Sequence, residues 1–215
     1  MKVKNAVICA AGIGSRLELD MPKCLVEING KRIIYYLLKA LEDVPNVRVV
    51  VGFKEEEVIE YVRSIRKDVV FVRNQNYRST TNSFSLYLGS KDFNAPFINI
   101  DGDNLITKEN FQKFVDTIKP DQDLIGVTPS YTEDAVFAKL NDNNEIVEFS
   151  REPISNYEWT GVAYFAKTKI KKDGKYIYQE LEDNLPIKAC IIECFEVDTP
   201  QDLEYVSKNF KFDEF

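Results

Sequence analysis

The stretch VKNAVICAAGIGSRL, residues 3–17, determines most of the expected fold. Its apolar first part predicts a buried strand over residues 2–9, and two glycines, Gly12 and Gly14, follow that strand. A glycine-rich turn directly after a buried strand allows backbone N–H groups to surround an anion. Arg16 and Lys23 would add two cations. The stretch therefore predicts a phosphate-binding loop at the carboxyl end of the first strand.

Strands and helices alternate after this loop. Apolar runs and helical spacings predict strands over 46–53, 68–74, 95–101 and 123–129, and helices over 31–44, 54–66, 80–90 and 107–118. Beyond residue 130, short strands over 135–141, 146–150, 158–166 and 188–197 accompany helices over 176–184 and 199–210. Thr107 is the expected N-cap of its helix, and Thr199 that of the last one. We expect an α/β fold: a mostly parallel, mixed sheet with helices on both faces and a late antiparallel insertion.

The composition narrows the class of protein. The chain has 215 residues and 44% hydrophobic residues, enough for one domain with a full core. Its 35 acidic and 28 basic residues give a net charge of −7, which argues against a nucleic-acid partner. Without an apolar run of about 20 residues we expect no membrane insertion and a cytoplasmic location. The four cysteines, with no histidine beside them, are expected to be buried and free.

The sequence of the glycine loop does not match two common phosphate-binding motifs. A Walker loop needs GxxxxGK followed by Ser or Thr, which the chain lacks. A dinucleotide fold needs a third glycine where Leu17 stands, and an acidic residue at the end of the second strand, where Gly52 stands. A loop around a nucleoside triphosphate remains, beside the plain alternative of a glycine turn with solvated Arg16 and Lys23.

Carboxylates end two predicted strands. Asp101 and Asp103 follow the strand FINI, and Asp198 follows the last strand. Such residues are typical Mg²⁺ ligands, although Asp101 would also suit a turn and Asp198 would also suit the residue before the N-cap. The DGD sequence is also compatible with the DxD motif of glycosyltransferases, which does not explain Arg16 and Lys23 in a glycine loop.

Across nearly its whole length the chain resembles a known family. AAGIGSRL followed by MPKCLVEINGKRII resembles the AAGxGxRL…PK signature of nucleotidyltransferases that activate sugar phosphates and alcohol phosphates. The resemblance implies a Rossmann-like fold, Mg²⁺ held by Asp103 and Asp198, and catalytic roles for Lys23 and Arg16. It implies that the triphosphate meets the loop residues Ala10, Ala11, Gly12, Ile13, Gly14 and Ser15.

The segment after the third strand bears on the choice of nucleotide. The spacing of Asn74, Tyr77, Asn82 and residues 85–88 resembles that of bacterial phosphocholine cytidylyltransferases, which implies CTP. The nucleotide-binding residues implied there are Asn74, Thr81, Asn82, Ser83 and Asp101. Capping of the helix by residues 80–82 would explain the same polar residues and is compatible with a contact to the base.

The later part of the chain also resembles inositol-1-phosphate cytidylyltransferases, in AKLNDNNEIVEFSRE leading to WTGVAYF. This resemblance implies that Arg151 faces the acceptor phosphate. Tyr157 and Trp159 would suit a quaternary ammonium group, although a lone Trp in a strand is more often core.

The expected reaction transfers CMP from CTP to a small phosphorylated alcohol, such as phosphocholine, with an inositol phosphate or a sugar 1-phosphate as alternative acceptors. A nucleotide-binding regulator without catalysis is the alternative of another class. We expect one domain, 1–215, with a nucleotide-binding part (1–130), acceptor-binding strands (131–197) and a closing helix (198–215). The oligomeric state stays open, a homo-oligomer included.

Overall fold

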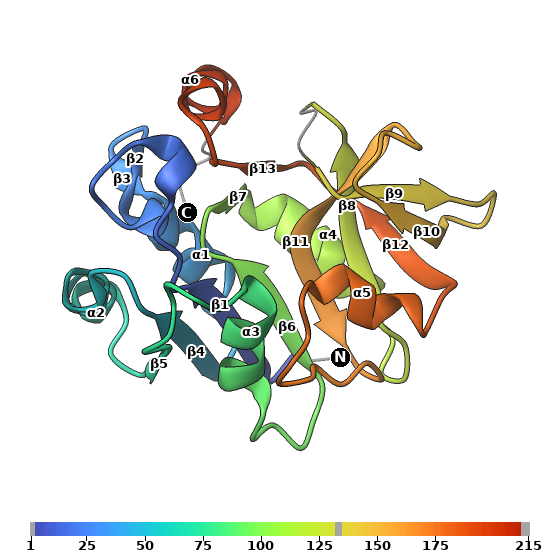
Figure 1. Ribbon diagram of the computed structural model, residues 1–215, viewed down its shortest axis with the longest axis horizontal. Helices are drawn as coiled ribbons and strands as arrows, with labels where there is room; N and C mark the ends of the chain where they lie inside the picture. The colour runs from blue at the N-terminus through green and yellow to red at the C-terminus, as the bar shows by residue number, and fades with distance from the viewer. Residues whose placement is uncertain (1–2, 132–134, 212–215) are drawn as a thin grey trace.

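The computed structural model describes residues 3–131 and 135–211, and these residues form a nine-stranded central sheet (Figure 1). Its strand order is β5-β4-β1-β6-β11-β8-β12-β10-β9. The bounds are β1 Asn5–Ala10, β4 Asn46–Val51, β5 Val70–Arg73, β6 Phe97–Asp101, β8 Leu124–Pro129, β9 Phe137–Leu140, β10 Glu145–Ser150, β11 Tyr157–Phe165 and β12 Ile187–Ile191. Strands β5, β4, β1 and β6 are parallel, as are β8 and β12, whereas β11 runs antiparallel between β6 and β8. The predicted mostly parallel, mixed sheet is confirmed.

The central strand β1 is buried on both faces. Ala6, Ile8 and Ala10 belong to one hydrophobic cluster, and Val7 and Cys9 belong to the other. Successive side chains of a strand point to opposite faces, so an uninterrupted apolar run is what a strand covered on both sides requires. This burial explains why the apolar run before the glycine loop predicts the fold so directly.

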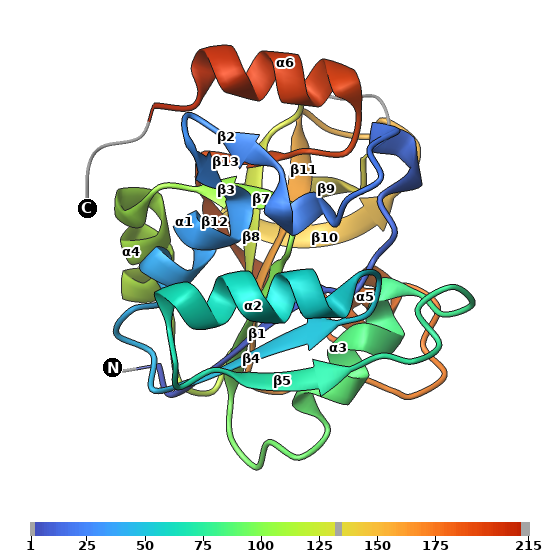
Figure 2. The same ribbon diagram turned by 90° about the vertical axis from the view of Figure 1, so that its left-hand side faces the viewer.

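Six helices of the described residues cover the sheet. Their bounds are α1 Ile33–Ala40, α2 Glu55–Ile65, α3 Asn82–Ser90, α4 Lys108–Thr117, α5 Ile177–Glu182 and α6 Pro200–Asn209. Buried side chains of α1, α2, α4 and α6 belong to one cluster, and those of α3 and α5 belong to the other, so the helices pack on both faces as expected. Figure 2 shows α6 lying across the top of the molecule, above the short strands β2 (Glu27–Ile28) and β3 (Lys31–Arg32).

The predicted N-caps of two helices are confirmed. The Thr107 hydroxyl accepts the Asn110 N–H at 3.2 Å. Thr199 and Asp202 form a reciprocal capping box at the start of α6. Thr81 stands at the N-cap of α3, but its side chain makes no capping bond and instead donates to the Gly174 carbonyl group at 3.4 Å. The capping explanation for the TTN segment therefore fails for this side chain.

Two predicted elements are wrong in their extent. The helix expected over 31–44 covers Ile33–Ala40, because Lys31–Arg32 forms β3 and pairs with β2, Glu27–Ile28. The single strand expected over 188–197 is split: β12 joins the main sheet, whereas β13, Cys194–Glu196, pairs with β7, Asn104–Ile106. Periodicity within a segment does not reveal a change of pairing partner.

Some predicted positions fall outside the described residues: Lys2 of the first strand, 132–134 of the acceptor-side part and 212–215 of the closing segment. Within the described part of the chain, no helix combines the length and apolar character needed to cross a membrane. All four cysteines are buried and free, as predicted.

Candidate active site

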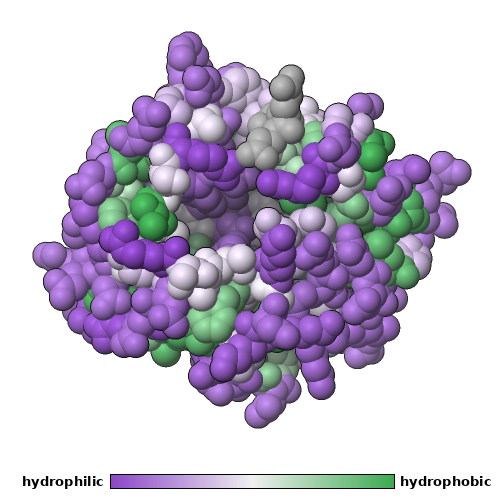
Figure 3. Space-filling view, viewed as in Figure 1, coloured by the Kyte–Doolittle hydropathy of each residue, from purple (hydrophilic) through white to green (hydrophobic). Residues whose placement is uncertain are grey.

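The candidate site is a cavity of about 260 Å³ at the carboxyl ends of β1 and β6, which we call the first cavity. Figure 3 shows a hollow near the centre of this face, with mostly hydrophilic walls. Open α/β sheets bind ligands at this edge because loops diverge there from neighbouring strands. Of the predicted site residues, those that line the first cavity are Ala10, Ala11, Gly12, Gly14, Arg16, Lys23, Thr81, Asn82, Asp101, Asp103 and Asp198.

The glycine loop is packed against the lysine that follows it. Gly14 has φ +67°, in the left-handed region that favours glycine, and a Cβ there would lie 2.6 Å from Lys23 Cγ. Two short 3-10 turns, Ser15–Leu17 and Lys23–Leu25, return the chain to the cavity. Ile13 and Ser15 belong to the loop without being among the described residues that line the first cavity.

The cations of the loop are paired with the carboxylates across the cavity. Lys23 Nζ lies 2.9 Å from Asp103 Oδ2 and is also paired with Asp198. Arg16 is paired with Asp198 from the other side. The side chains of Lys23, Asp103 and Asp198 are 17%, 17% and 10% exposed, so these charges interact in a partly desolvated site. Two cations and two carboxylates thus balance one another where a charged ligand would bind.

The ribbon of β7 and β13 brings the two aspartates together. Glu196 pairs with Asn104, and the Val197 N–H donates to the Asp103 carbonyl group at 3.1 Å. At the start of α6, the Asp202 carboxylate accepts the Asp198 N–H at 3.1 Å. Asp198 therefore precedes the N-cap of α6 and also lines the first cavity. Its place at the start of a helix is compatible with a role in the site.

Glu196 is a site residue that the sequence interpretation missed. Oxygen atoms of Asp103, Glu196 and Asp198 lie within 4.8 Å of one another. Loss of solvent around the Glu196 carboxyl group in the cavity wall, and then the nearby Asp103, raise the pKa of Glu196, against the influence of Lys23 and Arg16. In the strand FEVD, Glu196 and Asp198 are two residues apart and share a face, which is the signal that could have found it. An all-carboxylate cluster fits a hard cation such as Mg²⁺.

Asp101 is held by two amide side chains. Its Oδ1 accepts from Asn82 at 2.8 Å and from Asn99 at 3.2 Å. Burial and then the nearby Asp103 raise the pKa of Asp101 to about 7. Gly161 has φ +75°, and a Cβ there would lie 2.7 Å from Asp101 Oδ2, so the glycine of the WTG sequence makes room for this carboxylate.

The far end of the first cavity is uncharged and is lined by Tyr77, Thr80 and Ser85. Asn74, predicted to bind the nucleotide, is buried behind these residues. It donates to the hydroxyl groups of Thr80 and Ser85 instead of lining the first cavity. The sequence spacing thus indicated a segment that lines the first cavity, but it could not distinguish a side chain that lines the cavity from one that supports it.

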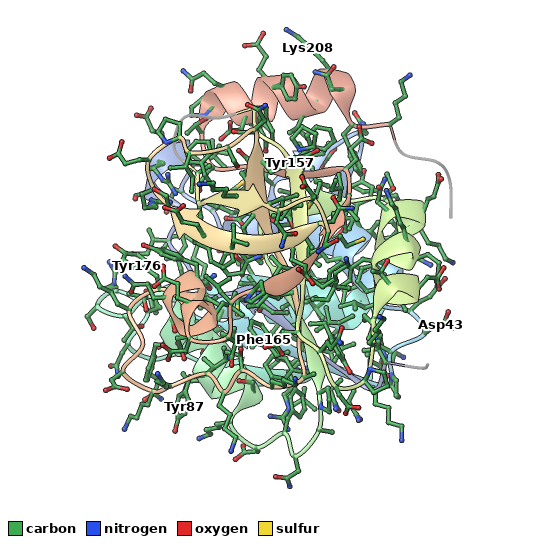
Figure 4. The ribbon with its side chains drawn as sticks, turned by 90° about the vertical axis from the view of Figure 1, so that its right-hand side faces the viewer. Asp43, Tyr87, Tyr157, Phe165, Tyr176 and Lys208 are labelled. Carbon is green, nitrogen blue, oxygen red and sulfur yellow. The ribbon has the colours of Figure 1, made fainter. Side chains whose placement is uncertain are left out.

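A second cavity, of about 350 Å³, adjoins the first and shares its Asp101, Glu196 and Asp198 walls. Of the predicted residues, Ser83, Arg151 and Trp159 also line it, and so do Tyr176 and Tyr178. The Ser83 hydroxyl donates to Glu180 at 2.6 Å. Tyr157 is not among the described residues that line either cavity; it packs against the second hydrophobic cluster. Figure 4 shows Tyr157 and Tyr176 well apart.

Trp159 packs against the hydrophobic core and also lines the second cavity. Its ring lies 6.3 Å from that of Phe149, and its indole N–H donates to the Val162 carbonyl group at 3.3 Å. It is half-buried, so one part packs against the core and another lines the second cavity. Tyr176, stacked on Tyr178 at 5.6 Å, is 42% exposed. The second cavity therefore has aromatic walls next to the carboxylates of the first.

Comparison with known proteins gives a family for this architecture. The MobA-like NTP transferase domain matches residues 6–144, which include the glycine loop, Lys23 and the DGD sequence. The chain belongs to this family. The predicted resemblance to nucleotidyltransferases, including choline-phosphate cytidylyltransferases, is thereby confirmed.

Relatives of this NTP transferase domain include characterised enzymes. The chain is 32% identical over 113 residues to the choline-phosphate cytidylyltransferase of Streptococcus pneumoniae, a match that covers 50% of this chain and 48% of that one. It is 24% identical to the bifunctional IPC transferase and DIPP synthase of Aquifex aeolicus, over 96% of this chain and 51% of that one. The chain thus spans about half the length of these curated relatives.

Solved structures share the fold of this domain. The CTP:phosphocholine cytidylyltransferase of Streptococcus pneumoniae has a TM-score of 0.74 at 23% identity, with 98% of this chain and 100% of that chain covered. The inositol-1-phosphate CTP transferase of T. maritima has a TM-score of 0.73 at 19% identity, with 98% of each chain covered. At such identities the likeness establishes the nucleotide-diphospho-sugar transferase type of fold.

Proposed function

We propose that the protein is a metal-dependent cytidylyltransferase that transfers CMP from CTP to a small phosphorylated alcohol and releases pyrophosphate. The observation that carries the proposal is the pair of adjoining cavities, which share Arg16, Asp101 and Asp198. A transferase needs two substrates to meet at one point, and a protein that only binds a nucleotide needs no second cavity.

In this proposal the first cavity takes the nucleotide. Backbone N–H groups of the glycine loop, with Arg16 and Lys23, hold the phosphates, and the uncharged end beside Tyr77 and Ser85 takes the base. Lys23 is the catalytic cation, since an ammonium group at the α-phosphate stabilises the charge that develops there. The choice of cytosine is supported by the cytidylyltransferases among the relatives.

The cofactor in this proposal is Mg²⁺. Asp103 and Asp198, joined by Glu196, would hold the ion through their carboxylate oxygens. When bound, the ion would neutralise phosphate charge and help to align the reacting groups. Lys23 and Arg16, which pair with these aspartates, would then turn to the phosphates of the nucleotide.

The second cavity takes the acceptor. Arg151 provides a guanidinium group for its phosphate. Trp159, Tyr176 and Tyr178 provide aromatic surface, which suits the quaternary ammonium group of phosphocholine. The pneumococcal relative acts on choline phosphate, which supports this choice of acceptor.

The reaction needs no general base, which agrees with a chain that has no histidine. An acceptor phosphate is already ionised near neutral pH, so its oxygen attacks the α-phosphorus of CTP directly. A new P–O bond forms, the bond between the α-phosphorus and the bridging oxygen breaks, and pyrophosphate leaves with the electron pair. The protein contributes alignment and positive charge.

Pyrophosphate release tests the proposal. The purified protein is assayed with CTP, UTP, GTP or dTTP and with phosphocholine, phosphoethanolamine, aminoethylphosphonate, inositol 1-phosphate or a sugar 1-phosphate, with and without Mg²⁺. We expect turnover only with Mg²⁺, an acceptor and CTP. Inositol phosphate is the second candidate acceptor, because the inositol-1-phosphate CTP transferase of T. maritima shares the fold over 98% of the chain. Tight CTP binding without pyrophosphate release for any acceptor would favour a regulator.

A further inference from the structure

The uncharged end of the first cavity is organised by the buried side chain of Asn74. Its Oδ1 accepts the N–H of Asn76 at 3.0 Å. Its Nδ2 donates to the hydroxyl oxygens of Thr80 and Ser85, each at 3.0 Å. The bonds to Asn76 and Thr80 lie within the segment that connects β5 to α3, whereas the bond to Ser85 reaches α3 itself. Thr80 and Ser85 both line the first cavity.

The direction of these bonds follows from chemistry. A backbone N–H can only donate, so the Asn74 oxygen must face Asn76 and the NH2 group must face the two hydroxyls. The Thr80 hydroxyl passes its own hydrogen to the Asn76 carbonyl group at 2.9 Å. If the amide were flipped, its NH2 group would face the N–H of Asn76, and two donors would stand against each other. The observed orientation is therefore the stable one.

Ser85 is thereby left with a hydrogen to donate. Its hydroxyl is buried and lines the first cavity, and Asn74 is its one hydrogen-bond partner among the described residues. A helical serine often donates to the carbonyl group four residues earlier, as Ser90 of the same helix does to Leu86 at 2.7 Å. Ser85 makes no such bond with a described residue, so its O–H group can point into the cavity.

We propose that Asn74 is a positioning residue that fixes Ser85 as a hydrogen-bond donor toward the nucleobase and thereby favours cytosine over uracil. The inference rests on the proposed function, in which phosphates lie against Lys23 and Arg16 and the base lies at the uncharged end. Cytosine N3 carries a lone pair and accepts a hydrogen bond, whereas uracil N3 carries a hydrogen. A donor fixed opposite N3 therefore forms a hydrogen bond with cytosine and strengthens its binding. The same donor faces the N3–H of uracil, which weakens the binding of that base.

Two variants test this inference. Ser85→Ala removes the donor, so we expect CTP to bind about tenfold more weakly while UTP binds as tightly as before or more tightly. Asn74→Asp is studied at alkaline pH so that the new carboxylate is ionised. The Ser85 hydroxyl then donates its hydrogen to this carboxylate and presents its oxygen lone pairs to the base. We expect the CTP:UTP preference to fall about tenfold or more, with improved use of UTP.

The measurements are calorimetric affinities for CTP and UTP with Mg²⁺, together with kcat/KM for both nucleotides. Ser90→Ala is the matched control, because it removes a buried hydroxyl from the same helix away from the first cavity; its CTP:UTP ratio should equal that of the wild type. Thermal melting establishes that each variant is folded, and Ser85→Ala decides alone if Asn74→Asp does not fold.

Several results would overturn the inference. An equal loss for CTP and UTP in Ser85→Ala would mean that the hydroxyl contacts an atom common to both bases. An unchanged ratio in the variants would remove Ser85 from base selection while cytidylyl transfer by the wild type still stood. If the wild type releases no pyrophosphate, the proposed transfer fails, and the binding ratios still decide whether Asn74 and Ser85 select the base.

Discussion

The two cavities are built in different ways. The wall of the first comes from the stretch 9–24, from residues 77–85 before and at the start of α3, from the DGD sequence, and from Glu196 and Asp198. The wall of the second comes from separate pieces: the end of β10, the middle of β11 and the segment leading into α5. Both have charged walls, but the first presents the backbone and small residues of the glycine loop, whereas the second presents the aromatic side chains of Trp159, Tyr176 and Tyr178.

This difference explains where sequence interpretation succeeds. Phosphate binding needs close backbone approach and cations, which a short glycine-rich motif after a strand provides by itself. Recognition of an acceptor needs side chains that meet only after the chain has folded. The predictions below test whether the first cavity provides the chemistry and the second provides the choice of acceptor.

The largest effect is expected at the carboxylates between the cavities. Asp103→Asn and Asp198→Asn should each lower kcat by at least about 1,000-fold, because an amide of the same shape brings no charge to a metal ion. Activity assays and calorimetry with Mg²⁺ and CTP measure this. The exposed Asp116→Asn, on α4, is the control. Near-normal rates in both variants would mean that the metal assignment is wrong.

Lys23→Met should lower kcat by about 100-fold or more and raise KM for CTP much less, because charge at the α-phosphate grows toward the transition state. Methionine keeps the methylene stem that packs against Gly14. Steady-state kinetics with saturating acceptor separate the two constants. A loss confined to KM would make Lys23 a residue that binds the ground state alone.

Arg151→Ala should lower kcat/KM for the acceptor by roughly 10-fold to 150-fold, the equivalent of a charge-assisted contact of about 1.5 to 3 kcal/mol, and leave CTP affinity unchanged. Arg151→Lys should retain much of the activity if charge suffices, and lose it if a bidentate contact is required. Tyr157→Phe, outside both cavities, is the control. An alanine variant with wild-type acceptor kinetics would remove Arg151 from the site.

The smallest effects separate the two glycines of the loop. A Cβ at Gly12 would touch no protein atom within 4 Å, so Gly12→Ala should keep the melting temperature and weaken CTP binding about tenfold by occupying room for the phosphates. Gly14→Ala should instead destabilise the fold by about 1 to 2 kcal/mol, because φ is +67° and Lys23 lies against the new Cβ. Equal melting temperatures in the two variants would contradict this distinction.

The fold and half of the candidate site are accessible from sequence for a physical reason. A strand buried on both faces needs an apolar run, as β1 has from Ala6 to Ala10, and a glycine loop after it is a local feature. Asp103 and Asp198 are recognisable because both stand at strand ends. Glu196 was missed because an acidic residue of a strand looks solvent-facing until the partner strand is known.

The sequence by itself determined the alternation of strands and helices, the cation-bearing glycine loop and the family. Only the tertiary structure decided that β12 and β13 separate, that β13 and β7 bring Glu196 and Asp198 to Asp103, and that Asn74 supports the cavity from behind while Tyr157 lies outside it. The physical reason is the separation along the sequence over which each interaction acts. Strand propensity and turn chemistry act over a few neighbouring residues, whereas β13 pairs with residues about 90 positions away.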